Sequence, residues 1–279
     1  MSYVQGSRTN LGSESASIST TVAGEGEFRT AYHGTYRGGQ RNQQEAICKK
    51  FKPKYARLQD EYFAADFKVA DKCIEIAELW NQGCTSKREI QITRGDIQST
   101  RDGTKYLVEP LIRYFTKFTS NNGWISKTGS TDAKYMEAFA HYSYHRSGGQ
   151  LLICDLQGRY RKDKWKAARC RFELTDPAIC SRQRRYGPTD LGEKGIESFF
   201  ANHVCNEFCS HFGRTKGKPW SSPKQPKQWF PLSEGTSMLS SMFTAQLSTT
   251  SRTVFTESMM TVAEGDEEEE SDSDDYYGY

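Results

Sequence analysis

Large apolar residues are concentrated between residues 24 and 213 of this 279-residue chain, and this distribution limits where a core can form. Residues 1–23 are rich in Ser, Thr and Gly and cannot bury enough apolar surface to offset the entropy of ordering. From residue 214 onward repeated prolines exclude helices and central strands, and the chain ends in an acidic run whose like charges repel. We therefore expect a disordered lead over 1–23, one domain over 24–213, and a disordered Pro/Ser/Thr-rich linker with an acidic tail over 214–279.

The composition is that of a globular protein. Charged residues make up 26% of the chain and the net charge is only +3, which gives no argument for a nucleic-acid partner. No apolar run approaches the ~18 residues needed to span a bilayer, and the first residues lack the apolar stretch of a signal peptide. We expect a cytoplasmic protein without a membrane partner, whose eight cysteines are thiols or metal ligands rather than disulfides.

The first half of the domain alternates strand-like and helix-like patterns. The stretches FRTAYHGTY (28–36) and EAICKKF (45–51) flank a turn-prone segment, which predicts a hairpin. Between residues 61 and 83 apolar side chains recur every three or four positions, and the pattern ends at a glycine. This spacing predicts an amphipathic helix.

The second half adds further strands and a helical end. The stretches TKYLVEPLI (104–112) and QLLICDLQG (150–158) predict buried strands, and GIESFFANHVCNEFCSHF (195–212) predicts a second helix. A hairpin, a helix, more strands and a helical end together predict an α+β fold.

Lys49 is the first residue whose position suggests chemistry. A strand period of two places Ile47, Lys49 and Phe51 on one face, so the lysine would point inward and need an anionic partner. The alternative is an edge strand on which both Lys49 and Lys50 reach water. The strand pattern alone leaves both interpretations open.

Two aspartates follow strand-like stretches. Asp155 ends a buried strand with Gln157 two residues later, and Asp176 precedes a proline that keeps it extended. Carboxylate and amide oxygens are ligands that Mg²⁺ prefers, and Mg²⁺ usually arrives with nucleotide phosphates. A plain turn aspartate is the alternative for each.

The heptapeptide HVCNEFC places His203, Cys205 and Cys209 within seven residues. On a helix Cys205 and Cys209 share one face, as two soft ligands of one ion should, but His203 would sit ~200° from Cys205. The histidine can join the same ion only if the helix bends or breaks between them. A tetrahedral zinc ion would need a fourth ligand from elsewhere; buried thiols without a metal are the alternative.

Taken in order, these stretches resemble the alpha-kinases, the atypical protein kinase family that includes elongation factor 2 kinase, myosin heavy chain kinases and the kinase domains of melastatin-type channels. The matching motifs are FRTAYHG, ICKKF, YLVEP, AFAHYSYHRSGGQLLICDLQG, LTDPAICS, YGPTDLGEKGI and FFANHVCNEFC. The resemblance covers about 24–213. It implies a two-lobed protein-kinase-like alpha-kinase fold, with an N-lobe of about 24–110, a C-lobe of about 111–213 and ATP in the cleft.

The resemblance assigns roles in the N-lobe. Arg29 and Lys49 match residues that contact the ATP phosphates, and Glu109 matches the residue beside the adenine in the hinge. These roles imply a buried Lys49.

In the C-lobe, Asp155 resembles the catalytic aspartate, and Gln157 with Asp176 resembles the magnesium-binding pair. Lys49, Arg29 and Mg²⁺ would then offset the phosphate charge while Asp155 orients a Ser or Thr hydroxyl of a protein substrate. Which aspartate acts on the hydroxyl stays open.

The resemblance also supplies a fourth metal ligand. His141 in AFAHY matches the histidine that joins His203, Cys205 and Cys209 in the family. Four protein ligands leave no open position, which implies a structural zinc site in the C-lobe.

One segment departs from the family pattern. Residues 159–173 lengthen the stretch between Gln157 and Asp176 and include seven Lys or Arg. Three interpretations stay open: a surface excursion that leaves the ligands in place, a basic patch that recruits an acidic substrate or the chain's own acidic tail, and an error in the conceptual translation.

The leading hypothesis is an active Ser/Thr protein kinase of the alpha type, with Ser- and Thr-rich flanks as candidate autophosphorylation sites. The alternative is a catalytically inactive, zinc-stabilised kinase-like binding module. A zinc-dependent hydrolase would need an open metal position.

Overall fold

The computed structural model describes residues 13–26, 28–83, 88–162, 170–209 and 219–234. All of them belong to one compact unit, Met1–Met242. The expected acidic tail and most of the expected linker lie outside the described residues. None of the helices in the described part of the chain is long and apolar enough to cross a bilayer.

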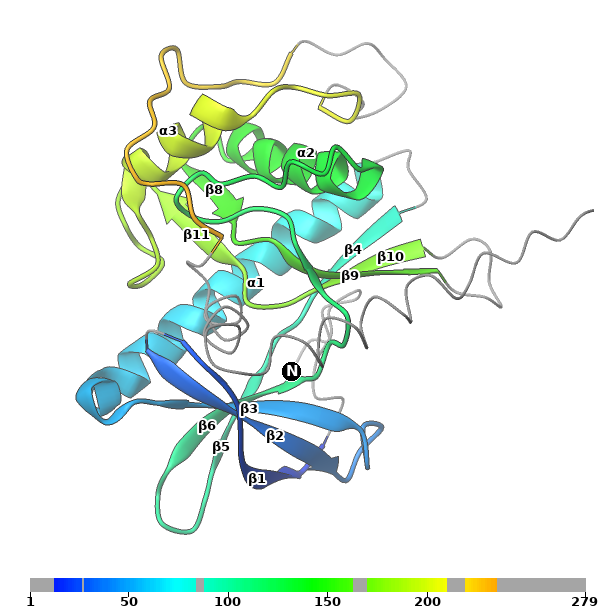
Figure 1. Cartoon of the computed structure of the whole chain (residues 1–279), viewed down its shortest axis with the longest axis vertical. Helices are drawn as coiled ribbons and strands as arrows, with labels where there is room; N and C mark the ends of the chain where they lie inside the picture. Colours follow the sequence, from blue (N-terminus) through cyan, green and yellow to red (C-terminus); the bar gives the residue numbers. More distant parts are fainter. Residues whose placement is uncertain (1–12, 27, 84–87, 163–169, 210–218, 235–279) are drawn as a thin grey trace, which may run out of the picture. The chain divides into compact units, whose positions relative to one another are not determined.

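A five-stranded antiparallel sheet forms the N-terminal part of the fold (Figure 1). Its strand order is β1-β2-β3-β6-β5. The strands are β1 (Ser15–Glu25), β2 (Arg29–Arg37), β3 (Glu45–Phe51), β5 (Asp96–Ser99) and β6 (Lys105–Pro110). Strands β2 and β3 pair from Arg29↔Phe51 to Thr35↔Glu45, so the predicted hairpin is confirmed.

Strand β1 corrects the expected disordered lead. Residues 15–25 pair with β2 along its whole length, although most of their side chains are exposed. Ala16 and Ile18 are half-buried and pack against the apolar cluster around Tyr36. Ser and Thr tolerate an extended backbone, and the ladder partner supplied by β2 could not be read from this segment alone.

The predicted amphipathic helix is confirmed as α1 (Gln59–Gly83), which a short 3-10 helix, η1 (Pro53–Leu58), precedes. Its apolar stripe is buried, including Phe63, Ala70, Ile74 and Ala77. Helix α1 packs against β4 and α2. Near its start Phe63 packs with Phe51 of β3 and Leu107 of β6, so α1 links the N-terminal sheet to the rest of the domain.

Two smaller sheets form the second part. The four-stranded sheet has the order β4-β10-β9-β7, with bounds Arg88–Ile92, Cys170–Leu174, Gln157–Lys162 and Thr116–Lys117. The two-stranded sheet pairs β8 (Leu151–Cys154) with β11 (Ala178–Ser181). The predicted strands at 104–112 and 150–158 correspond to β6 and to β8 with the start of β9.

Helices α2 (Thr131–Arg146) and α3 (Gly192–Asn202) cover the small sheet, α2 against β8 and α3 against β11 (Figure 1). Helix α2 was not predicted, because it is buried on nearly every side from Tyr135 to Tyr144 and has no apolar stripe. Its N-cap is Ser130, whose hydroxyl accepts a hydrogen bond from the Ala133 amide.

Trp80 lies at the centre of the larger core. Its indole Nε1 donates to the Tyr135 hydroxyl at 2.8 Å, and that hydroxyl donates to the Arg88 carbonyl at 2.6 Å. Tyr135 also stacks on Phe172 of β10. One buried chain of hydrogen bonds thus ties α1, α2 and β4 together.

The segment 219–234 differs from the expected disordered linker. Trp220 is buried against Trp80 and His141, and Asn122 donates to the carbonyl oxygens of Pro231 and Ser233. Prolines exclude regular structure here, but they do not prevent an extended segment from packing through its tryptophan and its carbonyl groups.

Candidate active site

Lys49 lies on the central strand β3 and is 1% exposed, so the edge-strand alternative is wrong. Its Nζ is 2.6 Å from Glu109 Oε2 and 3.1 Å from Asp176 Oδ1. Burial favours the neutral amine, but Asp176 and then Glu109 outweigh it and raise the pKa of Lys49. The ammonium is therefore charged and joins β6 of the first sheet to the residue that follows β10.

Arg29 begins β2 and is 2% exposed. Its guanidinium lies over the Phe51 ring and pairs with Asp66 of α1. Its Nε and Nη1 have no hydrogen-bond partner among the described residues. Buried donors of a charged group carry a cost that an acceptor from a ligand would relieve.

Asp155 and Asp176 share an unusual backbone conformation. Their φ angles are +53° and +54°, in the left-handed region that Asp and Asn tolerate better than most residues. Such strained positions cluster at functional sites. The extended backbone expected for Asp176 before its proline is therefore wrong.

The carboxylate of Asp155 is 2% exposed and pairs with Lys117 rather than with Lys49. Lys117 Nζ is 2.9 Å from Asp155 Oδ1. Burial disfavours the ionised carboxylate of Asp176, but the positive charges of Lys49 and then Arg29 outweigh burial and hold its pKa below the usual value. Its second oxygen, Oδ2, has no hydrogen-bond partner in the described part of the chain.

Gln157 is fully buried at the start of β9, and its carbonyl accepts a hydrogen bond from the Thr175 amide at 3.1 Å. The next residue, Gly158, has a φ of +154°, and a side chain there would collide with the Glu173 carbonyl. Gln157 and Asp176 therefore lie at the same end of the β9–β10 hairpin.

The basic segment 159–173 continues this hairpin. Its two arms are the antiparallel strands β9 and β10, and β10 also pairs in parallel with β4. Residues 163–169 lie outside the described residues. The arms lengthen the hairpin away from Gln157, in agreement with an excursion that leaves both candidate ligands in place.

The residues of HVCNEFC do not form the predicted helix. Helix α3 ends at Asn202, and His203 is extended, with φ −77° and ψ +129°. The predicted second helix is therefore wrong over residues 203–209, and residues 210–212 lie outside the described residues. This break is the one that His203 needs to face the same point as the two cysteines.

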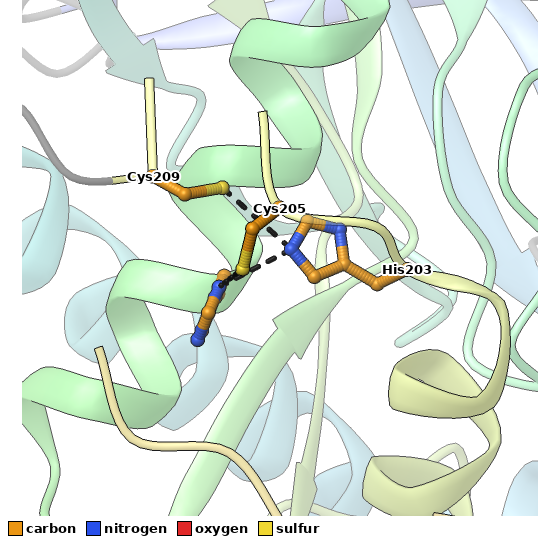
Figure 2. Close-up of side chains that lie close together, drawn as sticks. His203, Cys205 and Cys209 are labelled. Atoms are coloured by element: carbon orange, nitrogen blue, oxygen red, sulfur yellow. Dashed lines mark hydrogen bonds between the residues drawn. The ribbon is translucent and has the colours of Figure 1, made fainter. Parts of the chain in front are cut away.

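Figure 2 shows the side chains of His203, Cys205 and Cys209 converging. With His141 of α2 they offer four ligand atoms that all lie within 4.8 Å of one another. His141 Nδ1 is 3.2 Å from His203 Nε2 and 3.6 Å from Cys205 Sγ, and Cys209 Sγ is 3.6 Å from His203 Nε2. A tetrahedral zinc ion needs ligand atoms about 3.3–3.8 Å apart, which these distances nearly match.

In each histidine the ring nitrogen that points away from the cluster, the outer nitrogen, has a hydrogen-bond partner. His141 Nε2 donates to the Ser221 carbonyl at 3.0 Å, and His203 Nδ1 lies 3.2 Å from the Glu137 carboxylate. Each partner can accept a hydrogen bond from an N–H of the outer nitrogen, the tautomer that leaves the inner nitrogen able to bind a metal. Burial and then His203 lower the pKa of His141 to about 4, so this imidazole is neutral. The inner nitrogens of both histidines and the two thiols point to one place, an arrangement that suits a metal ion.

Sequence reasoning missed Lys117 and Asp66. Each pairs with a predicted site residue 37 or 38 positions away. A lysine between two phenylalanines in YFTKF was the available signal for Lys117.

A family model described as "Alpha-kinase family" matches residues 24–209. The chain is similar to the alpha-protein kinase vwkA of Dictyostelium discoideum, with 33% identity over 102 residues, or 36% of this chain and 15% of that protein. It is also similar to myosin heavy chain kinase B of the same organism, with 26% identity over 71% of this chain and 25% of that protein. The chain thus spans a quarter or less of these relatives.

Solved structures with similar folds include an alpha kinase from Entamoeba histolytica, with 26% identity, a TM-score of 0.57, and coverage of 76% of this chain and 83% of that one. The alpha-kinase domain of myosin heavy chain kinase A in complex with ADP has 22% identity, a TM-score of 0.58, and coverage of 71% and 87%. The latter likeness concerns the fold. The family match, with the matching α+β architecture, establishes that this chain belongs to the alpha-kinase family.

Proposed function

We propose that this chain is an ATP-dependent protein serine/threonine kinase. The observation that carries the proposal is the buried ion cluster of Lys49, Glu109 and Asp176, which joins the two parts of the fold at 2.6 and 3.1 Å. A family of protein kinases, and a structural relative solved with ADP, supply the reaction class.

The donors and acceptors of the cluster suit a nucleotide with a divalent cation. Lys49 and the unpartnered nitrogens of Arg29 suit phosphate oxygens, while Gln157 and the unpartnered oxygen of Asp176 suit magnesium. When bound, ATP with Mg²⁺ supplies the γ-phosphoryl group and offsets part of its charge.

The chain's own residues then position the substrate hydroxyl and stabilise the charge on the transferred phosphoryl group. Asp155 is the candidate to accept a hydrogen bond from the Ser or Thr hydroxyl of a protein substrate. Lys117 Nζ, 2.9 Å from Asp155 Oδ1, holds that carboxylate in place. Lys49 and Arg29 offset negative charge on the transferred group without forming a bond to it.

We infer a structural zinc site from His141, His203, Cys205 and Cys209. Two ring nitrogens 3.2 Å apart, two nearby thiols and the hydrogen-bond partners of both outer ring nitrogens support it. Four protein ligands leave no position for a reacting water, which argues against a zinc hydrolase. The ion would hold the end of α3 against α2.

The test measures transfer of labelled phosphate from ATP to a generic basic protein and to the chain itself. Asp155→Ala should lower the rate by about 10²–10⁴-fold, whereas Asp102→Asn in an exposed turn should not. If the wild type binds ATP with Mg²⁺, seen as a rise in melting temperature, but transfers nothing, the inactive binding module replaces the kinase.

Several expectations stay predictions. They are the lobe boundary near residue 110, autophosphorylation of the flanks, the cytoplasmic location, and the absence of nucleic-acid and membrane partners.

A further inference from the structure

A pocket of about 650 Å³ lies beside Pro110 and Leu111, directly after Glu109. None of the candidate nucleotide-site residues lines it. We call it the arginine pocket, and its charged members are Arg41, Arg113, Arg159, Arg161, Arg171 and Glu173, with Glu45 at the rim. Five arginines against two glutamates leave an excess of positive charge.

Three of these arginines come from the basic hairpin and surround one carboxylate. Glu173 is 3% exposed; Arg159 Nε donates to it at 2.8 Å, and Arg171 and Arg161 lie 3.5 and 3.8 Å away. Three guanidinium groups carry about fifteen N–H donors, while one carboxylate offers about four acceptor sites. Glu173 holds the three guanidinium groups in place but can accept hydrogen bonds from only some of their N–H donors.

The other two arginines lie next to the N-terminal sheet, Arg41 in the turn between β2 and β3 and Arg113 just after β6. Arg41 is buried and donates to the Gln44 side chain at 3.0 Å, and Arg113 pairs with Glu45 at the outer edge. The pocket is therefore walled by both parts of the fold, and its positive charge is fixed in place from two sides.

The spacing of the arginines matches an extended chain. Arg159 and Arg161 are two residues apart on β9, so they point to the same side about 6.6–6.8 Å apart along the strand. Arg171 stands opposite Arg161 in the ladder. Alternate side chains of an extended peptide have the same repeat. A single phosphate ion would fill only a small part of this volume.

We propose that the arginine pocket binds an extended acidic segment of a partner protein, with carboxylates at alternate positions. The guanidinium group of arginine forms two parallel hydrogen bonds with a carboxylate, so the contact is specific in geometry as well as in charge. Binding at this pocket does not require phosphate transfer, so it can be tested apart from the kinase proposal.

The experiment measures fluorescence anisotropy of a labelled peptide of alternating Glu and Ser with the full chain. A non-hydrolysable ATP analogue and Mg²⁺ are present in excess, so that the nucleotide site is occupied. Arg161→Gln should weaken binding about fivefold to tenfold. Glu173→Gln should tighten it several-fold, because it removes the competing carboxylate.

Arg101→Gln is the matched control, because this arginine is exposed in the turn before β6 and does not line the pocket. The proposal is overturned if Arg101→Gln weakens binding as much as Arg161→Gln does, or if an alternating Lys and Ser peptide binds equally well. Tighter binding of a single-stranded oligonucleotide would assign the pocket to nucleic acid instead, and full displacement by inorganic phosphate would reduce it to a simple anion site.

Discussion

Replacing Lys49 with methionine should expose the energetic role of the buried ion cluster. Lys49 is 1% exposed, and its partners Glu109 and Asp176 have side-chain exposures of 8% and 18%. At an effective dielectric constant of about 20, charges at these distances attract by about 6 and 5 kcal/mol, before the cost of burying the ammonium. Removing one partner of a buried cluster typically costs about 3–5 kcal/mol. We expect Lys49→Met to lose that amount near neutral pH.

The loss should depend on pH in a defined direction. The pKa of Asp176 is lower in the folded protein than in the unfolded chain. The ionised carboxylate therefore stabilises the fold at pH values above the unfolded pKa, and this stabilisation is lost as the pH falls through the folded pKa. Without Lys49 most of this contribution is absent. The difference between the wild type and Lys49→Met should be constant above about pH 5 and should shrink below about pH 4.

Urea denaturation across this pH range measures both quantities. Lys50→Met is the control, since Lys50 is the neighbouring residue on β3, faces the other side and is partly exposed. Adding Asp176→Asn to Lys49→Met should recover part of the stability, because it removes a carboxylate that has lost its partner. A Lys49→Met variant as stable as Lys50→Met, or a loss that does not change on acidification, would refute this reasoning.

Three further outcomes follow from the site and the core. Gly158→Ala should destabilise the domain by more than 1 kcal/mol and abolish Mg²⁺-dependent binding of ATP, measured by calorimetry, because its Cβ would collide with the Glu173 carbonyl. A zinc chelator should lower the melting temperature of the wild type but not that of Cys209→Ser, in which the metal site is already lost. Tyr135→Phe should cost about 1–3 kcal/mol in urea denaturation, since it removes the hydroxyl that accepts from the Trp80 indole and donates to the Arg88 carbonyl, whereas Tyr114→Phe on the surface should cost little.

Elements with a periodic apolar pattern could be predicted. The β2–β3 hairpin and α1 follow directly from spacings of two and of three to four residues. The inward orientation of Lys49 follows from the same two-residue spacing, provided that β3 is a central strand of the sheet. Helix α2 does not, because a helix buried on nearly all sides has no stripe for a periodicity argument to find.

Features set by partners distant in sequence could not be predicted. Strand β1 is polar and depends on its ladder with β2. The end of α3 at Asn202 depends on His141 and the facing cysteines, because only a broken helix brings His203 to them. Lys117 is buried by its pairing with Asp155, 38 residues later. Each case is a tertiary contact that outweighs a local preference.

The basic segment shows why separation in sequence is a poor guide to the geometry of this site. Both candidate magnesium ligands lie where β9 begins and just beyond the end of β10, and the Thr175 amide holds that end closed on the Gln157 carbonyl. Because antiparallel strands pair residue by residue, added length moves the turn outward and leaves the open end unchanged. The same added length carries Arg159, Arg161 and Arg171 into a separate pocket. Added length in this hairpin can therefore leave the candidate magnesium ligands in place and contribute arginines to a separate pocket.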